Sequence, residues 1–227
     1  MPDEKGRFIV FEDLDGAGTS TQLSRLQRWL SSRGVAVEVT KEPSSGPLGA
    51  MVRLAIETRL ELDPKTLALA FAADRLDHIE NQINGVRKAL DDGRWVLCDR
   101  YVLSSLAYQG EEVDIEWLLA INHFAIEPDV TIFVDTNAEN CLQRIRLRSS
   151  SVDLYDSYEQ LKKVMRNYRR VVAQRQFVGH LITVNGNEAE ESVFEALLEQ
   201  FQEWLTKFVS QASILLGPTD LMLPENL

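Results

Sequence analysis

The fold of this chain is decided by one stretch near its start, Phe8-Ile9-Val10-Phe11-Glu12-Asp13-Leu14-Asp15-Gly16-Ala17-Gly18-Thr19-Ser20-Thr21. An apolar run leads into a turn with two glycines, and hydroxyl residues then open a segment in which leucines recur at helical spacing. This order predicts a buried strand, a tight turn and the start of a helix. The first N–H groups of a helix have no partner within the helix and attract anions. The stretch therefore predicts an anion-binding turn at the end of a strand.

The turn resembles the phosphate-binding loop pattern G-x-x-x-x-G-K-[ST], with two departures. Gly18 and Ser20 are in register with the pattern, and Ser20 stands where it has a Mg²⁺-binding hydroxyl. Asp13 occupies the first glycine position, where a positive φ can be required. Thr19 occupies the lysine position, which removes a positive charge, so Thr19→Lys is expected to be tolerated and to favour phosphate binding. The alternative is a helix N-cap without a ligand, since Ser and Thr are favoured there.

Composition limits the class of protein. The 227 residues suffice for one α/β domain, and 44% hydrophobic and 26% charged residues are ordinary for a globular chain. The net charge of −11 argues against a nucleic-acid partner. No apolar stretch approaches the roughly 18 residues that span a membrane, and the start of the chain lacks a signal-peptide pattern. Cys98 and Cys141 have no metal-like spacing and are interpreted as reduced thiols of a cytoplasmic protein.

The order of apolar runs and helical segments predicts the architecture. Strands are expected at 7–12, 35–40, 95–98, 130–135 and 181–185. Helical spacing is found at 64–90 (one or two helices), 115–125, 138–148, 158–176 and 190–209. Near-continuous apolar strands that alternate with helices predict a three-layer α/β/α fold around a five-stranded parallel sheet. Residues 1–209 are expected to form a single domain, and 210–227 a C-terminal tail.

A second charged turn follows the expected strand at 95–98. Asp99 and Arg100 leave this strand at its carboxyl end, where open parallel sheets place their ligands. A carboxylate there can hold the water shell of Mg²⁺, and a guanidinium can form two parallel hydrogen bonds with phosphate oxygens. The alternative is a surface ion pair. Together with the first turn, the pair predicts a phosphate site at this edge of the sheet.

Further segments, taken in order, resemble the thymidylate kinase family from about Arg7 to Leu205. Asp15-Gly16 matches the Asp-Gly of the family's loop. The other segments are Thr40-Lys41-Glu42-Pro43, Leu48-Gly49-Ala50-Met51-Val52-Arg53, Phe71-Ala72-Ala73-Asp74-Arg75 and Asp99-Arg100-Tyr101-Val102-Leu103-Ser104-Ser105-Leu106-Ala107-Tyr108-Gln109-Gly110. The last is the most specific of them. The resemblance implies a P-loop kinase fold.

The resemblance also implies roles for particular residues. The residues implied to bind ATP are Asp15, Gly16, Ala17, Gly18, Thr19, Ser20 and Thr21. Those implied to bind Mg²⁺ are Ser20 and Asp99. For the acceptor nucleotide they are Asp15, Lys41, Arg53, Phe71, Arg75, Arg100, Ser104, Ser105, Tyr108 and Gln109. Within this set, Arg53 and Arg100 are expected on the monophosphate, Phe71 and Arg75 on the base, and Asp15 near a sugar hydroxyl. The implied catalytic residues are Asp99, Arg100, Arg144 and Arg148.

An arginine-rich segment before Ser149-Ser150-Ser151 resembles the lid of bacterial-type family members, and the lid is expected at about 144–156. Arg144 and Arg148 share a helix face, while Arg146 points away. Such members carry the arginine that stabilises the transferred phosphoryl group in the lid, and Gly16 takes the loop position that holds it in the others. A solvated helix face is the alternative. Leu154 departs from the family, which has an arginine there.

The resemblance therefore implies an enzyme that transfers a phosphoryl group from ATP to dTMP with Mg²⁺, and it also implies a homodimer. A non-catalytic nucleotide-binding relative remains an alternative because the loop lysine is missing. A kinase of a different nucleoside monophosphate is a second alternative.

Overall fold

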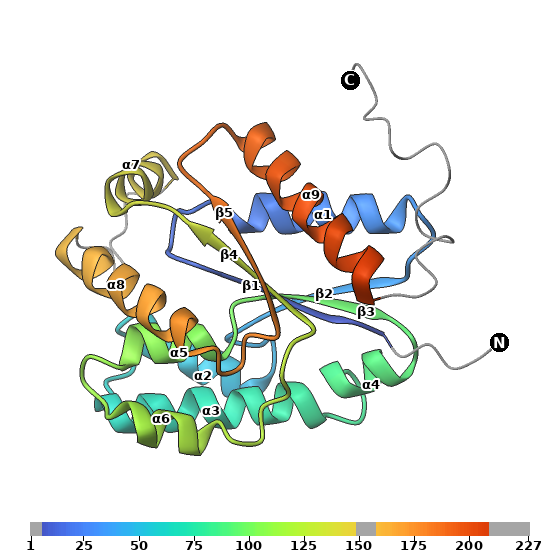
Figure 1. Ribbon diagram of the computed structural model, residues 1–227. Coiled ribbons are helices and arrows are strands. Elements are labelled where there is room, and N and C mark those ends of the chain that lie inside the picture. The colour runs from blue at the N-terminus through green and yellow to red at the C-terminus, as the bar shows by residue number, and fades with distance from the viewer. Residues whose placement is uncertain (1–5, 149–157, 209–227) are drawn as a thin grey trace.

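A five-stranded parallel sheet lies between helices in the computed structural model, which describes residues 6–148 and 158–208 (Figure 1). Its strands stand in the order β2-β3-β1-β4-β5. Their bounds are Phe8–Asp13 for β1, Val37–Lys41 for β2, Trp95–Asp99 for β3, Val130–Asp135 for β4 and His180–Asn185 for β5. The three-layer α/β/α fold with a five-stranded parallel sheet is confirmed.

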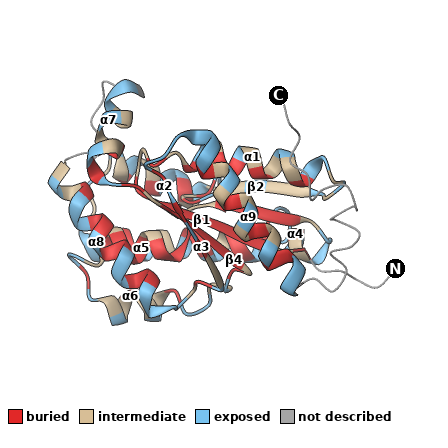
Figure 2. Cartoon of the chain, turned by 45° about the horizontal axis from the view of Figure 1, so that its top comes forward, coloured by how far each residue is buried: buried red, intermediate tan, exposed pale blue. Residues whose placement is uncertain are grey.

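The central strands are apolar because helices cover both faces of the sheet (Figure 2). All six residues of β1 are buried, and β3 and β4 are buried up to their last residues. The register pairs Phe11 of β1 with Asp99 of β3, and Asp13 with Val134 of β4. This register brings the polar ends of β1 and β3 to the same edge of the sheet.

Helices fill the outer layers (Figure 1). Helices α1 and α9 lie on one face of the sheet, and α2 to α6 lie toward the other. The bounds are Thr19–Ser31 for α1, Pro47–Ile56 for α2, Pro64–Glu80 for α3, Val86–Asp91 for α4, Val102–Gln109 for α5, Ile115–Ile121 for α6, Ala138–Arg148 for α7, Tyr158–Gln174 for α8 and Glu190–Phe208 for α9. None of the helices in the described ranges is long and apolar enough to cross a membrane.

Most expected elements differ from the observed ones by one or two residues. The segment 64–90 forms two helices, because the chain turns at Asn81 after α3 and Gly85 begins α4. Helix α8 ends at Gln174, ahead of Arg175 and Phe177, which both have a positive φ. The part of the expected lid at 149–156 and the tail at 210–227 lie outside the described residues.

Candidate functional site

The loop between β1 and α1 is a tight turn built on two glycines. Gly16 has φ 85° and Gly18 has φ 101°, a region that side chains rarely adopt. A Cβ on Gly16 would lie 2.5 Å from the carbonyl oxygen of Cys141 in α7, so the loop and α7 approach too closely for a side chain. Gly18 is the N-cap of α1, and the free N–H groups of the first helical turn therefore face the loop. The geometry is that of an anion-binding helix start.

Asp13 lies at the end of β1 in ordinary strand backbone, so the positive φ considered for this position is not found. The Thr19 hydroxyl donates to its Oδ2 atom. Both side chains are buried. Burial raises the pKa of Asp13 to about 7, because water no longer solvates the carboxylate. Asp13 and Thr19, the two residues that depart from the phosphate-loop pattern, are thus in direct contact.

Arg100 follows β3 with φ 70°, an uncommon conformation for a residue with a side chain. Its backbone N–H donates to the Phe11 carbonyl at 2.8 Å. Its Nη2 lies 2.7 Å from Asp15 Oδ1 and 3.3 Å from Asp13 Oδ1, and the guanidinium carbon lies 5.3 Å from the centre of the Tyr108 ring. Although burial favours the neutral form, these acidic neighbours raise the pKa of Arg100. The side chain is 20% exposed, so it is not a surface ion pair.

Ser20 and Asp99 meet across the edge of the sheet. The Ser20 hydroxyl donates to Asp99 Oδ2 at 3.1 Å. Both groups offer the hard oxygen atoms that Mg²⁺ prefers. In the ranges 6–148 and 158–208, no three or more His, Cys, Asp or Glu side chains are gathered so that they could hold a metal ion. The residues therefore fit a Mg²⁺ ion that is held largely by water and by nucleotide phosphates.

Two cavities open at this edge of the sheet. The smaller has a volume of about 160 Å³ and is lined by Asp13, Asp15, Gly16, Gly18, Thr19, Ser20, Thr21, Asp99 and Arg100. The larger has a volume of about 400 Å³ and is lined by Asp15, Lys41, Glu42, Pro43, Arg53, Ile56, Glu57, Phe71, Arg75, Asp99, Arg100, Tyr101, Ser104, Ser105, Tyr108 and Gln109. Every residue expected at the acceptor nucleotide lies in the larger cavity. Three residues, Asp15, Asp99 and Arg100, line both.

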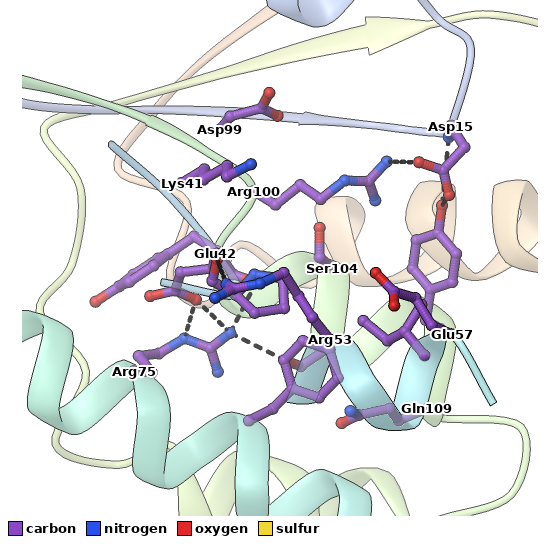
Figure 3. A pocket seen from close by; sticks show the side chains of 16 residues that line it. Asp15, Lys41, Glu42, Arg53, Glu57, Arg75, Asp99, Arg100, Ser104 and Gln109 are labelled. Carbon is purple, nitrogen blue, oxygen red and sulfur yellow. Dashed lines mark hydrogen bonds and ion pairs between the residues drawn. The ribbon is translucent and has the colours of Figure 1, made fainter. Parts of the chain in front are cut away.

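The larger cavity is lined by both charged and apolar side chains. Lys41, Asp99 and Arg100 lie on one side and Gln109 on the opposite side (Figure 3). Gln109 is 6% exposed, and its Oε1 atom has no hydrogen-bond partner among the described residues. A buried carbonyl oxygen that lacks a partner is costly, so the position suits a ligand that donates an N–H group.

Arg75 forms part of the wall of the larger cavity and is 2% exposed. Its Nε donates to Glu42 Oε2 at 2.8 Å, and Nη2 donates to the Tyr101 carbonyl at 3.1 Å and to Ser105 Oγ at 3.0 Å. Nη1 donates to Asn122 Oδ1. The guanidinium expected on the base is therefore bonded to protein on all three nitrogens, and it joins α3 to α5 and to the loop after β2.

The loop after β2 is fixed by α2 and α3. Asp74 accepts hydrogen bonds from the Ser44 N–H at 2.7 Å and from its hydroxyl at 2.5 Å. Arg53 donates to the Ser44 carbonyl and, at 3.3 Å, to that of Pro43. The Glu42–Pro43 peptide bond is cis. Arg53 is thus held at the rim of the larger cavity, where its charge faces the same space as Lys41.

Glu12 is buried behind Tyr101 and Ser104 of the larger cavity, and the sequence assigned it no role. It accepts hydrogen bonds from the Tyr101 N–H at 3.0 Å, the Ser104 hydroxyl at 2.6 Å and the Tyr168 hydroxyl at 3.1 Å. Burial raises its pKa to about 7, despite these hydrogen bonds and the charge of Arg100. Glu12 therefore ties β1 to α5 and α8. An acidic residue directly after a fully apolar strand run was the signal available in the sequence.

Helix α7 places one arginine at the phosphate loop. Arg144 Nη1 donates to the Ala17 carbonyl and Nη2 to the Gly186 carbonyl, each at 3.0 Å. Arg146 on the same helix is exposed, as the helical spacing predicts. The Arg148 side chain lies outside the described part of the chain. The structure thus brings Arg144 to the loop and leaves Arg146 away from it.

Some residues of the larger cavity were not assigned from the sequence. They are Glu42, Pro43, Ile56, Glu57 and Tyr101. Glu42 and Tyr101 stand inside segments that carry the family resemblance, which was the signal that could have found them. Ile56 and Glu57 come after the recognised part of α2, and no local pattern marks them.

The parallel sheet, the glycine loop before α1 and the turn after β3 with Asp99 and Arg100 together define an α/β protein of the P-loop kinase fold. Comparison with known proteins narrows the class. The sequence model of the family described as thymidylate kinase matches residues 11–197. The chain belongs to the thymidylate kinase family.

Individual relatives cover most of the chain. A "Probable thymidylate kinase" from Pyrococcus horikoshii is 38% identical over 74% of this chain and 83% of the relative. A "Probable thymidylate kinase" from Thermococcus kodakarensis is 34% identical over 84% of this chain and 95% of the relative. A "Thymidylate kinase" from Caldicellulosiruptor saccharolyticus is 32% identical over 89% of this chain and 99% of the relative.

Proposed function

We propose that this protein transfers the terminal phosphoryl group of ATP to dTMP, giving dTDP and ADP. The observation that carries the proposal is Arg100, which lines both the loop cavity and the larger cavity. A side chain in that place can contact both the group that is transferred and the phosphate that accepts it. Membership of the thymidylate kinase family supports the choice of substrates.

The larger cavity is the proposed acceptor site. Its volume of about 400 Å³ suits a nucleoside monophosphate. Lys41, Arg53 and Arg100 would bind the monophosphate. Phe71 would stack on thymine, and the Gln109 carbonyl would accept the N–H of the pyrimidine ring, while Ser104, Ser105 and Tyr108 would shape the site. Arg75 would act here indirectly, by holding the wall residues Glu42, Tyr101 and Ser105 in place.

Asp15 is proposed near the sugar of the acceptor. Tyr108 donates a hydrogen bond to Asp15 Oδ2 at 3.1 Å, and Arg100 holds its other oxygen. The carboxylate is therefore fixed at the boundary between the two cavities. An ionised carboxylate in that place can accept a hydrogen bond from a sugar hydroxyl.

The loop from Asp15 to Thr21 is the proposed donor site. Backbone N–H groups at the start of α1 would bind the phosphates of ATP. Ser20 and Asp99 would hold Mg²⁺, which neutralises phosphate charge when it is bound. Asp99 would orient the acceptor phosphate, whose oxygen attacks the terminal phosphorus in line as the bond to ADP breaks. Arg100, Arg144 and Arg148 would stabilise the charge of the transferred group.

A coupled assay of ADP release, with Mg²⁺, ATP and each nucleoside monophosphate in turn, tests the activity. The highest kcat/KM is expected with dTMP, because Phe71 and Gln109 line the proposed site of the pyrimidine ring and a purine is larger. Faster turnover of AMP or GMP would favour a kinase of a different monophosphate. Retained nucleotide binding without dTMP-dependent ADP release would favour the non-catalytic alternative.

The proposed assembly is a homodimer. Large apolar side chains are exposed on α2, on α3 and after α6, namely Met51, Leu54, Leu69, Leu76 and Phe124. Leu69 and Leu76 are seven residues apart, so they lie on the same face of α3. Light scattering of the purified protein tests the assembly. A mass of 25.8 kDa, that of one chain, would contradict it.

We also propose one domain over residues 1–209, a lid at about 144–156, a tail at 210–227 and a cytoplasmic setting. The two cysteines, Cys98 and Cys141, are buried and free, which suits a reducing compartment. Limited proteolysis tests the domain limits. Cleavage within 210–227 should leave one protected core, whereas two protected fragments would contradict a single domain.

A further inference from the structure

The two departures from the phosphate-loop pattern form a pair in space. Thr19 donates its hydroxyl to Asp13 Oδ2, and the two side chains are only 2% and 4% exposed. A lysine at position 19 and a glycine at position 13 would form no such bond. The contact explains why Asp13 and Thr19 occur together, since each side chain is the hydrogen-bond partner of the other.

The second oxygen of Asp13 faces Arg100. Asp13 Oδ1 lies 3.3 Å from Arg100 Nη2, and Asp15 Oδ1 lies 2.7 Å from the same nitrogen. Two carboxylates and an uncommon backbone conformation therefore fix the guanidinium at the loop. Among the described residues that line the loop cavity, Arg100 is the one with a positive side chain.

We propose that Thr19 and Asp13 position the Arg100 guanidinium so that it supplies the positive charge that a lysine would otherwise bring to the donor phosphates. Thr19 and Asp13 are positioning residues in this account, and Arg100 makes the contact with phosphate. The inference rests on the proposed function, because it takes the loop as the place where the phosphates of ATP bind.

The pair explains why a lysine at position 19 would not restore the common pattern by itself. An ammonium beside the buried Asp13 carboxylate would form an ion pair with it instead of reaching the phosphates. Arg100 would then lose one of its two carboxylate partners. A glycine at position 13 would likewise leave Thr19 and Arg100 without a shared partner. Asp13→Gly and Thr19→Lys are needed together to replace the arrangement of Asp13, Thr19 and Arg100 with the common glycine and lysine pattern.

A double-mutant cycle between Thr19 and Arg100 tests the mechanism. The readout is the dissociation constant of ATP with Mg²⁺, measured by calorimetry on the full chain. Thr19→Val keeps the shape and removes the hydroxyl, and it should weaken ATP binding roughly 10-fold, whereas Thr19→Ser should restore it. In an Arg100→Ala background, Thr19→Val should have no further effect. The same fold-change in both backgrounds would overturn the inference.

A second cycle uses Asp13→Gly and Thr19→Lys. The double variant should bind ATP at least roughly 10-fold more tightly than the product of the two single effects predicts. Additive effects in variants that melt as cooperatively as the wild type would contradict the pairing. The first cycle keeps the inference testable if Asp13→Gly fails to fold, because Thr19→Val is close in size to the native residue.

The chain offers a matched control for the lost hydroxyl. Thr66 donates to Asp63 at 2.5 Å at the exposed start of α3, so Thr66→Val removes the same kind of bond far from the loop. ATP affinity should not change in this variant. A wild-type protein that fails to bind ATP would overturn both the proposed function and this inference. Binding by the wild type with an unchanged Thr19→Val variant would overturn this inference alone.

Discussion

The two cavities that share Arg100 differ in how their charge is arranged. The larger is lined by four basic side chains, Lys41, Arg53, Arg75 and Arg100, and by four acidic ones. The loop cavity is lined by Asp13, Asp15 and Asp99 around a single arginine. A phosphate in the larger cavity therefore meets cations already in place. A phosphate at the loop would depend on backbone N–H groups, on Arg100, on Mg²⁺ when it is bound and on Arg144 of α7.

The largest expected effect comes from removing the residue that the two cavities share. Arg100→Ala should lower kcat/KM roughly 1,000-fold, or about 4 kcal/mol, because one charge-assisted contact to the transferred group is lost. Arg100→Lys should recover only part of the activity, since it keeps the charge without the paired hydrogen bonds. Steady-state kinetics with dTMP varied measures both. Near-normal dTMP affinity in a folded Arg100→Ala variant would remove Arg100 from the acceptor side.

The next effect concerns Glu12, which holds Tyr101 and Ser104 of the larger cavity in place. Its folded pKa of about 7 lies above the ordinary 4.5, so the folded state holds a proton that the unfolded state releases as pH rises. Stability from this group is complete below about pH 4.5 and is lost by pH 7 to 8, a loss of roughly 3 kcal/mol. Glu12→Gln should remove that part of the decline.

Denaturant unfolding of the wild type and Glu12→Gln at pH 5 and pH 8 measures this difference. The wild type should lose more stability than the variant over that interval. The pKa of Asp13 is raised in the same direction, so some decline should remain in the variant. An equal decline in the two proteins would show that Glu12 is ionised throughout.

A smaller effect separates the two cavities. Arg144→Ala should lower kcat roughly 100-fold while dTMP affinity stays within about 3-fold, because Arg144 lies at the loop and not in the larger cavity. Arg146→Ala is the matched control, since Arg146 is exposed on the same helix. Comparable losses in both variants would indicate a role for the helix surface and not for the contact with the loop.

The smallest expected effect concerns Phe71, an aromatic residue that lines the larger cavity. Phe71→Ala should weaken dTMP binding roughly 10-fold through lost stacking, with ATP affinity unchanged. Lys65→Ala on the same helix is the control, because Lys65 is exposed and lies outside the cavity. Competition calorimetry with dTMP and the purine monophosphates reads both. A Phe71→Ala variant that binds dTMP normally would place the base elsewhere.

The sequence predicts the sheet well because strands buried on both faces are continuous apolar runs, as in 130–135, which forms β4 over the same residues. It predicts the acceptor-site residues of the larger cavity because they fall in ordered family segments, whereas no local pattern marks Ile56 and Glu57. It could not predict that Arg75 bonds Glu42, 33 residues away, because such pairing depends on how α3 packs against the loop after β2. It could not predict the contact of Thr19 with Asp13 either, because a contact between side chains six residues apart leaves no local pattern. The effect of Thr19→Lys on phosphate binding stays a prediction.

The acidic lining of the loop cavity has a consequence for the choice of inhibitors. Where a phosphate loop carries a lysine, a basic group on a ligand is repelled. Here the same group would meet the three carboxyl groups of Asp13, Asp15 and Asp99 around the single cation of Arg100. A compact amine attached to a thymidine-like scaffold would therefore gain ion pairs in this chain and lose affinity for lysine-bearing loops. The absence of the loop lysine thus gives a basis for inhibitors that prefer this protein to relatives with a lysine in the loop.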